Sequence, residues 1–495
     1  MAQQPATTLT MTFDTPTDPR TEGDHPRPIP LCLDLDGTLL RSDLLIESAL
    51  ALLARNPLWL LLFPWWLLGG KANLKRQIAG RVVTDASHLP FDTRVVALAQ
   101  EARAAGRPVI LCTASDELLA RPIVEHLQFD GLLASDGATN LSGSRKAQAL
   151  VERYGDKGFD YAGNASVDLH VWKRARQAIV LGPDALARRA SAMAEVGLHL
   201  PSPQAGLRTW TKAIRAHQWL KNLLVFVPLL ASHRFMDAHA LVQAVVAFFA
   251  FSLCASGVYV LNDLLDLPSD RRHPRKRNRP FASGQVLLLH GILAAPALTI
   301  AGFALALVVS PGFFGVLIGY YILTLAYSLQ LKRVVVLDVI LLAALYTIRI
   351  IGGAIAIDSE LSFWLLAFSM FMFLSLAMLK RYTELSVMLA NGRGKASGRG
   401  YAVEDLPLIQ SLGAASGYIA VMVLALYINS PESVALYSQP KLIWLICPLV
   451  LYWISRAWVV AHRGQMDDDP IVFAVKDRPS QLVGIVAAAT IFFAT

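Results

Sequence analysis

Three aspartates near the middle of the chain are spaced for metal binding. Asn262 and Asp263 begin the segment NDLLDLPSDRRHPRKRNRP (262–280), and Asp266 and Asp270 follow at steps of three and four. These steps place the three carboxylates on one face of a helix end, where they would repel one another without a cation. Mg²⁺ takes a few protein oxygens and completes its shell with water and substrate phosphates. The spacing therefore predicts a Mg²⁺ site for a phosphate-bearing substrate.

Basic residues surround these aspartates and provide candidate partners for phosphate. Arginine and lysine bind phosphate through charge-assisted hydrogen bonds, which are stronger than neutral ones. The candidates for substrate binding in this segment are Asn262, Arg271, His273, Lys276 and Arg279. For His273, a structural cap is an equally good interpretation. The alternative for the whole segment is a solvated loop whose charge only sets membrane topology, but the acidic residues would add nothing to that role.

Further candidates for substrate binding are spread over the second half of the chain. They are Lys221, Asn222, Tyr327, Lys332, Asp338, Arg349, Lys380 and Arg381. Arg349 falls inside an apolar run, where an unpaired charge is costly. We therefore expect Arg349 either to bind an anionic substrate or to pair with a carboxylate for structural reasons.

A second pair of carboxylates follows an apolar run near the N-terminus. Asp34 and Asp36 belong to LDLDGTL (33–39), directly after residues of strand type. Active sites of open α/β sheets form at the carboxyl ends of the strands. The two carboxylates are therefore in a place where an α/β protein does its chemistry.

The elements that must hold Asp34 and Asp36 follow an α/β pattern between residues 29 and 205. Short apolar runs alternate there with stretches of helical period. The runs are residues 31–35, 109–112, 131–134, 159–162 and 178–181. Such alternation predicts a Rossmann-like parallel sheet with helices on both faces. Residues 1–28, which are polar, are predicted to form a flexible tail.

One segment of this first domain, PLWLLLFPWWLLGG (57–70), does not fit the α/β pattern. It is too short to span a bilayer and is interrupted by Pro64. A buried helix of a cap subdomain is one interpretation. We favour a membrane-facing insert with Trp59, Trp65 and Trp66 at the level of the lipid headgroups.

The second domain, residues 206–495, is predicted to be an all-α membrane domain with about nine transmembrane helices. The apolar runs are 218–235, 239–261, 286–308, 312–329, 336–356, 362–379, 408–428, 441–460 and 481–494. The whole chain is 54% hydrophobic and only 17% charged, whereas an average soluble protein is roughly 25% charged. This composition excludes a disordered protein and argues against a wholly soluble one.

The net charge of +8 arises entirely in the second domain. Residues 1–210 carry 22 basic and 22 acidic residues, whereas residues 211–495 carry 23 and 15. A basic excess within apolar sequence indicates a membrane surface or anionic substrates, and no nucleic acid, as partners. The loops 262–285, 330–335, 380–407 and 461–480 hold 16 of these 23 basic residues. The positive-inside rule then places these loops and the N-terminal domain in the cytoplasm.

The second domain resembles the UbiA-type intramembrane prenyltransferase superfamily in four segments that occur in the same order. They are HQWLKNLLVFVPL (217–229), NDLLDLPSDRRHPRKRNRP (262–280), YSLQLKRVVVLD (327–338) and MLKRYTEL (378–385). The sequence looks more specifically like the decaprenyl-phosphate phosphoribosyltransferase branch. One departure from the commoner prenyltransferases agrees with this: they usually carry two carboxylates in the second motif, whereas this chain has only Asp338.

This resemblance implies a membrane enzyme that moves 5-phosphoribose from phosphoribosyl diphosphate to a polyprenyl phosphate, for the synthesis of arabinan-type cell-wall glycans. Mg²⁺, held by Asp263, Asp266 and Asp270, would neutralise the leaving diphosphate. Such enzymes lie in the bacterial cytoplasmic membrane with the active site on the cytoplasmic side. The oligomeric state stays open, a homo-oligomer included.

The first domain resembles the haloacid dehalogenase-like phosphatases, which also use Mg²⁺. By this resemblance Asp34 is the nucleophile and Asp36 the acid and base. Thr113 binds the phosphate, Lys146 stabilises its charge, and Asp168 joins Asp34 and Asp36 at the metal. Asn164 stands where the family usually has aspartate, which leaves a degenerate, structural domain as an alternative.

Together the two resemblances imply a bifunctional enzyme. The membrane domain would make polyprenyl-phosphoryl-5-phosphoribose, and the phosphatase domain would remove its 5-phosphate. Two other functions stay open. One is an aromatic or quinone-precursor prenyltransferase that uses an isoprenyl diphosphate, and the other is a transporter or lipid-binding protein with a regulatory phosphatase-like domain.

Overall fold

The computed structural model describes residues 28–495 except 203–204, 391–399, 432–435, 467–468 and 495. The predicted tail, 1–28, therefore lies outside the described residues except for its last one. The chain forms two compact units. The first unit comprises residues up to 40 together with 69–86 and 91–202, and the second comprises 41–68, 87–90 and 203–495.

The first unit is built on a parallel sheet, as predicted. Its six strands lie in the order β3-β2-β1-β4-β5-β6. They are β1 (Leu31–Leu33), β2 (Val109–Asp116), β3 (Gly131–Ser135), β4 (Asp160–Gly163), β5 (Gln177–Leu181) and β6 (Glu195–Leu200). The sequence predicts the first five and misses β6. The strand order reverses between β1 and β4, and such a switch point opens a crevice at the carboxyl ends of the two strands.

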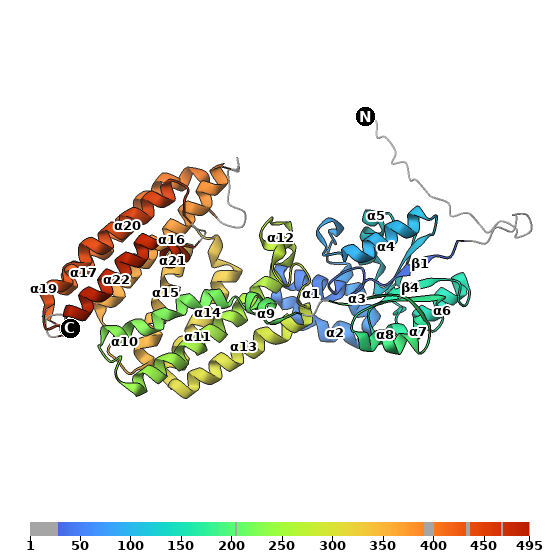
Figure 1. Cartoon of the computed structure of the whole chain (residues 1–495), viewed down its shortest axis with the longest axis horizontal. Helices are drawn as coiled ribbons and strands as arrows, with labels where there is room; N and C mark the ends of the chain where they lie inside the picture. The colour runs from blue at the N-terminus through green and yellow to red at the C-terminus, as the bar shows by residue number, and fades with distance from the viewer. Residues whose placement is uncertain (1–27, 203–204, 391–399, 432–435, 467–468, 495) are drawn as a thin grey trace, which may run out of the picture. The chain divides into compact units, whose positions relative to one another are not determined.

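Helices cover both faces of this sheet (Figure 1). On one face lie α4 (Thr93–Ala104) and α5 (Glu117–Leu127), and on the other lie α6 (Ser144–Tyr154), α7 (Leu169–Trp172) and α8 (Asp184–Ser191). A further helix, α3 (Lys71–Ala79), also belongs to this unit. Cys32, Tyr161 and Trp172 are buried in the core beneath α6–α8. The α/β fold class is confirmed.

The second unit is all-helical and contains, among the described residues, seven helices that are long and apolar enough to cross a membrane. Five of them are α11 (Ala238–Leu265), α13 (Leu288–Val309), α14 (Pro311–Leu329), α15 (Leu337–Ala356) and α16 (Phe363–Ala390). The sixth spans Val403–Ile428 and includes α17 (Leu406–Ile428). The seventh spans Pro440–His462, comprising α19 (Pro440–Ile443) and α20 (Ile446–His462).

Two of the nine predicted spans take other forms. The first is a distorted helix, η4 (Ala216–Phe226), followed by the short α10 (Val227–Ala231). The last, α22 (Arg478–Ala494), has only 17 residues, which is at the lower limit for spanning a bilayer. Short helices lie at the ends of the loops: α9 (Leu207–Ala213), α12 (Leu267–Arg272) and α21 (Pro470–Lys476).

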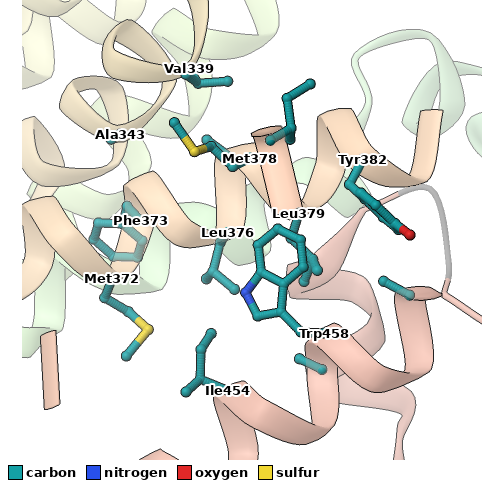
Figure 2. Packing of buried hydrophobic residues seen from close by; sticks show 14 of the residues in the cluster. Val339, Ala343, Met372, Phe373, Leu376, Met378, Leu379, Tyr382, Ile454 and Trp458 are labelled. Carbon is teal, nitrogen blue, oxygen red and sulfur yellow. The ribbon is translucent and has the colours of Figure 1, made fainter. Parts of the chain in front are cut away.

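Tight packing fixes the helices that carry the candidate residues. Figure 2 shows the core in which Phe373 and Met378 of α16 lie near Val339 of α15 and Trp458 of α20. At Gly353 of α15, an added Cβ would lie 2.1 Å from the carbonyl oxygen of Val225. Only glycine allows η4 to come this close to α15.

The segment 41–68 clusters with the helical unit, although the sequence assigns it to the domain 29–205. It contains α1 (Leu44–Arg55), η1 (Pro57–Leu62) and α2 (Phe63–Leu68). Leu50 of α1 is buried together with Leu264 of α11 and Phe281. This apolar contact, and an ion pair between Glu47 and Arg271, hold α1 against the membrane helices.

Candidate active sites

The first candidate site lies at the carboxyl end of β1. Asp34 follows this strand, and Lys146 at the start of α6 donates a hydrogen bond of 2.6 Å to Asp34 Oδ1. Both side chains are buried. Burial by itself lowers the pKa of the Lys146 ammonium, but the charges of Asp34 and Asp168 outweigh it and raise the pKa above its ordinary value. Lys146 therefore stays positively charged beside the candidate nucleophile.

The neighbouring strands contribute further polar groups. The Thr38 hydroxyl lies 3.3 Å from both Asp34 Oδ2 and Asn164 Oδ1, which brings β1 and β4 together at the switch point. Thr113 is fully buried at β2 and accepts a hydrogen bond from the Ser115 amide. The Ser115 hydroxyl in turn donates to Asp36 Oδ2 at 2.8 Å. Ser115 was not predicted from the sequence, although it lies only two residues after Thr113.

Tyr161 of β4 connects Lys146 to Asp168. Its hydroxyl accepts a hydrogen bond from Lys146 Nζ at 3.0 Å and donates one to Asp168 Oδ1 at 3.1 Å. Asp168 Oδ2 accepts from the backbone amides of Asn164 and Ala165. Burial, and then the charge of Asp34, raise the pKa of Asp168 to about 6. From the sequence, Tyr161 is predicted only as part of a buried strand, and nothing in its spacing indicates that its hydroxyl belongs to a polar site.

The oxygen donors at this switch point fit Mg²⁺, which prefers carboxylate and amide oxygens. Asp34, Asp36 and Asn164 offer such oxygens at the ends of β1 and β4. Asp168 accepts hydrogen bonds from the backbone amides of Asn164 and Ala165 as well as from the Tyr161 hydroxyl. Its contacts suit a residue that holds the backbone of Asn164 in place.

The second candidate site lies where α11 ends. Asp263 and Asp270 are both buried, and Arg279 Nη1 lies 3.1 Å from Asp263 Oδ1 and 2.5 Å from Asp270 Oδ2. Arg215, which the sequence analysis did not single out, also pairs with Asp263. Burial raises the pKa of Asp270 above its ordinary value, more than Arg279 lowers it. The site thus gathers two carboxylates and two guanidinium groups.

The three aspartates are not gathered into one cluster. No group of three His, Cys, Asp or Glu side chains could hold a metal ion in the part of the chain that the structure describes. The reason is that α11 ends at Leu265 and the chain turns at Asp266 before α12 begins. Helical spacing therefore does not continue from Asp263 to Asp270. Those two carboxylates still form a donor set that suits Mg²⁺ completed by substrate phosphates.

A third group of candidates lies deeper among the helices. Arg349 donates to Asn222 Oδ1 at 2.8 Å and to the Tyr320 hydroxyl at 3.1 Å, as well as to a backbone carbonyl. Among the described residues it pairs with no carboxylate, so the structural ion pair considered above is absent there. Lys221 forms an ion pair of 2.6 Å with Asp469, a residue that the sequence analysis missed.

Asp338 and Arg381 face each other in a buried ion pair of 2.6 Å. Arg381 also contacts Glu384 and the Tyr327 hydroxyl, and the Tyr401 hydroxyl donates to Asp338 at 2.6 Å. The single carboxylate of the second motif is therefore already neutralised by protein groups.

The remaining candidates are placed as follows. The Asn262 amide donates to the Ser328 hydroxyl at 2.9 Å. His273 Nδ1 accepts from the backbone amides of Arg275 and Lys276, which is a local cap. Arg271 pairs with Glu47. Lys332 lies in a short helical turn after α14, and Lys380 lies within α16.

The comparisons with known proteins agree with both resemblances. Residues 223–476 match the UbiA prenyltransferase family, and residues 31–171 match the haloacid dehalogenase-like hydrolases. The chain is 37% identical over 477 residues to protein y4nM of Sinorhizobium fredii, covering 94% of this chain and 91% of that protein. This relative spans both units of the chain.

Two other relatives match the second unit. The chain is 41% identical over 284 residues to nodulation protein NoeC of Azorhizobium caulinodans, covering 57% of this chain and 91% of that protein. It is 31% identical over 286 residues to decaprenyl-phosphate phosphoribosyltransferase of Mycobacterium tuberculosis, covering 57% and 92%. The chain is therefore a multi-pass membrane protein of the UbiA prenyltransferase family with a haloacid dehalogenase-like domain at its N-terminal side.

Proposed function

We propose that this protein transfers 5-phosphoribose from phosphoribosyl diphosphate to a polyprenyl phosphate and then removes the 5-phosphate. The observation that carries the first step is the similarity of the helical unit, over almost the whole length of the relative, to decaprenyl-phosphate phosphoribosyltransferase. The second motif, which has Asp338 as its single carboxylate, supports it. One carboxylate offers few oxygen ligands for a second Mg²⁺ on an allylic diphosphate.

In the transfer step, an oxygen of the lipid phosphate attacks the anomeric carbon as the bond from that carbon to diphosphate breaks. The attacking group is already an anion, so it needs little help from a base. Mg²⁺ held by Asp263 and Asp270 would neutralise the leaving diphosphate. Arg279 and Arg215, which lie against these carboxylates, would orient it by charge.

In the hydrolytic step, Asp34 attacks the phosphorus of the 5-phosphate and forms an aspartyl phosphate. The ribose 5-oxygen leaves with a proton from Asp36, and water then releases phosphate from Asp34. Lys146 is held beside Asp34 and balances the charge of the phosphoryl group. The Asn164 side chain, in place of the usual aspartate, still offers an oxygen to Mg²⁺.

The segment 57–68 supports a membrane-surface role for the insert. Leu58, Leu61, Trp65 and Leu68 each expose more than 60% of their surface. Leucine and tryptophan side chains of this kind bind at the interface of a bilayer. Together with the positive charge of the loops, this segment supports a location in the bacterial cytoplasmic membrane, with both sites on the cytoplasmic side.

The test is mass spectrometry of the lipid product made by the pure protein in lipid nanodiscs from polyprenyl phosphate, phosphoribosyl diphosphate and Mg²⁺. We expect polyprenyl-phosphoryl-ribose from the wild type. Asp34→Asn should give a product that retains one more phosphoryl group, and Asp263→Asn should give no product.

Two results would refute parts of this proposal. A ribosylated lipid that keeps its 5-phosphate in wild type and Asp34→Asn alike would remove the hydrolytic step. Prenylation of an aromatic acceptor from an isoprenyl diphosphate, with no ribosylated lipid, would replace the transfer step with the alternative reaction.

A further inference from the structure

The segment 41–68 brings a buried carboxylate into the helical unit. Glu47, in the first turn of α1, accepts two parallel hydrogen bonds of 2.6 Å from the two terminal nitrogens of Arg271. The side chains are only 10% and 6% exposed. A bidentate pair of this kind fixes both the distance and the orientation of the guanidinium plane.

The third nitrogen of Arg271 is also engaged. Its Nε donates to the carbonyl oxygen of Ala282 at 3.0 Å. All three guanidinium nitrogens of Arg271 are therefore bound by protein groups, although the sequence predicts a role in substrate binding for this residue. In this arrangement Arg271 connects α1, α12 and the loop that follows Arg279.

These connections converge on the carboxylates of the transferase site. Asp270 immediately precedes Arg271 on α12, and Arg279 lies three residues before Ala282. Arg279 is also the residue that contacts both Asp263 and Asp270. The pair of Glu47 with Arg271 thus fixes the backbone on both sides of the contact between Asp270 and Arg279.

The backbone of the segment supports the same attachment independently of charge. Gly284 has a φ of +70°, and an added Cβ would lie 2.3 Å from the carbonyl oxygen of Arg41. Leu50 packs one turn further along α1, in the cluster that contains Phe281 and Ala282. The segment is therefore fitted to the loop 281–286 by close contact as well as by the ion pair.

We propose that Glu47 is a positioning residue of the transferase site. It holds Arg271, and through it Asp270 and Arg279, in the arrangement that receives the diphosphate group of the donor with its Mg²⁺. A segment inserted in the sequence of the phosphatase-like domain is thus a working part of the transferase. The inference rests on the proposed function only for the diphosphate in the donor, which phosphoribosyl and isoprenyl diphosphates share.

The test measures the affinity of the full-length protein for inorganic diphosphate in the presence of Mg²⁺, by calorimetry in nanodiscs. Loss of a group that orients metal-site residues typically weakens binding or activity by about 10–100-fold, and we expect this for Glu47→Gln. Glu47→Asp, which keeps the charge on a shorter side chain, should bind with intermediate affinity. If Glu47→Gln fails to fold, the affinity of Glu47→Asp for diphosphate tests the proposal on its own.

The matched control is Asp237→Asn. Asp237 pairs with Arg234 and caps the start of α11, about 40 Å from the end of this helix that carries Asp263, so the change removes an ion pair far from the transferase site. Affinity equal to wild type in both Glu47 variants would overturn the proposal, as would an equal loss in Asp237→Asn. If the wild type binds diphosphate but transfers only prenyl groups, the proposed donor is refuted. The role of Glu47 is then still decided by the diphosphate affinities of its two variants.

Discussion

The hydroxyl of Tyr161 offers the sharpest test of the phosphatase site. It bridges Lys146 and Asp168 within a fully buried strand. Tyr161→Phe keeps the ring in the core and removes only these two hydrogen bonds. Asp168 Oδ1 then loses its partner, whereas Lys146 keeps the carboxylate of Asp34.

The expected cost follows from the charge of the two partners. A hydrogen bond to a charged group contributes about 1.5–3 kcal/mol to stability. The two bonds share one hydroxyl, so their contributions do not add in full. We expect Tyr161→Phe to lower the free energy of unfolding by about 2–4 kcal/mol. In a domain of about 150 residues each kcal/mol shifts Tm by about 2–4 °C, so the expected fall is roughly 5–15 °C.

The assay heats the full-length protein in detergent and measures its remaining phosphatase activity on a small phosphate ester. This gives the temperature of half-inactivation and, at low temperature, kcat. Tyr154→Phe is the matched control, because the Tyr154 hydroxyl makes no hydrogen bond with any described residue. If Tyr161→Phe is inactivated at the same temperature as Tyr154→Phe and keeps the wild-type kcat, the reasoning is refuted.

Three further predictions concern other parts of the chain. The folded state raises the pKa of Asp168 from 3.8 to about 6. The protonated carboxyl therefore contributes its full stabilisation below about pH 4, and this contribution is lost as the pH rises through 6. Asp168→Asn should therefore show a smaller fall in half-inactivation temperature between pH 5 and pH 8 than wild type, and an equal fall would contradict this. Gly284→Ala should weaken the binding of Mg²⁺ and diphosphate. Gly464 has a similar φ of +68° but no atom of the described residues near an added Cβ, so Gly464→Ala should leave this binding unchanged. Equal effects of the two variants would mean that backbone strain alone is responsible. A fluorophore on Leu61→Cys should be quenched by brominated lipids, and one on Val83→Cys should not, since the four native cysteines are buried and leave the label specific; equal quenching would argue against a membrane-facing insert.

The sequence predicts well those features that a local pattern encodes. The alternation of apolar runs with helical stretches predicts the parallel sheet. The family resemblance that the motif around Asp34 carries also selected Lys146, which lies 112 residues further along the chain. Both side chains follow or begin regular elements, so the fold brings them to the same edge of the sheet. The helical unit and its family could also be predicted, because apolar runs and short motifs are local patterns of the sequence.

Contacts between distant segments leave no such pattern. Arg215, Asp469 and Glu47 each pair with a selected residue, but each lies in a stretch that looks like an ordinary charged loop or helix. The end of α11 at Leu265 is equally hidden, because the residues on either side of it keep helical spacing. The positions of charges could be predicted, but which charges meet could not.

The first of the nine predicted spans was misjudged for a related reason. Its apolar composition resembles that of a spanning helix, but η4 and the short α10 are held against α15 by the close approach at Gly353. Tertiary packing therefore favours a distorted segment. That distortion places Asn222 where it can accept a hydrogen bond from Arg349.

The attachment of α1 to the membrane helices also sets an order of events during synthesis. Glu47 leaves the ribosome 224 residues before Arg271, which at about 5–20 residues per second is a delay of roughly 10–45 s. During this time Glu47 and the buried apolar face of α1 lack the partners that α11, α12 and the loop after Arg279 provide in the folded protein. The nascent chain must keep this segment from aggregating until α12 emerges, and the surface of the membrane into which the later helices insert is a natural place to do so.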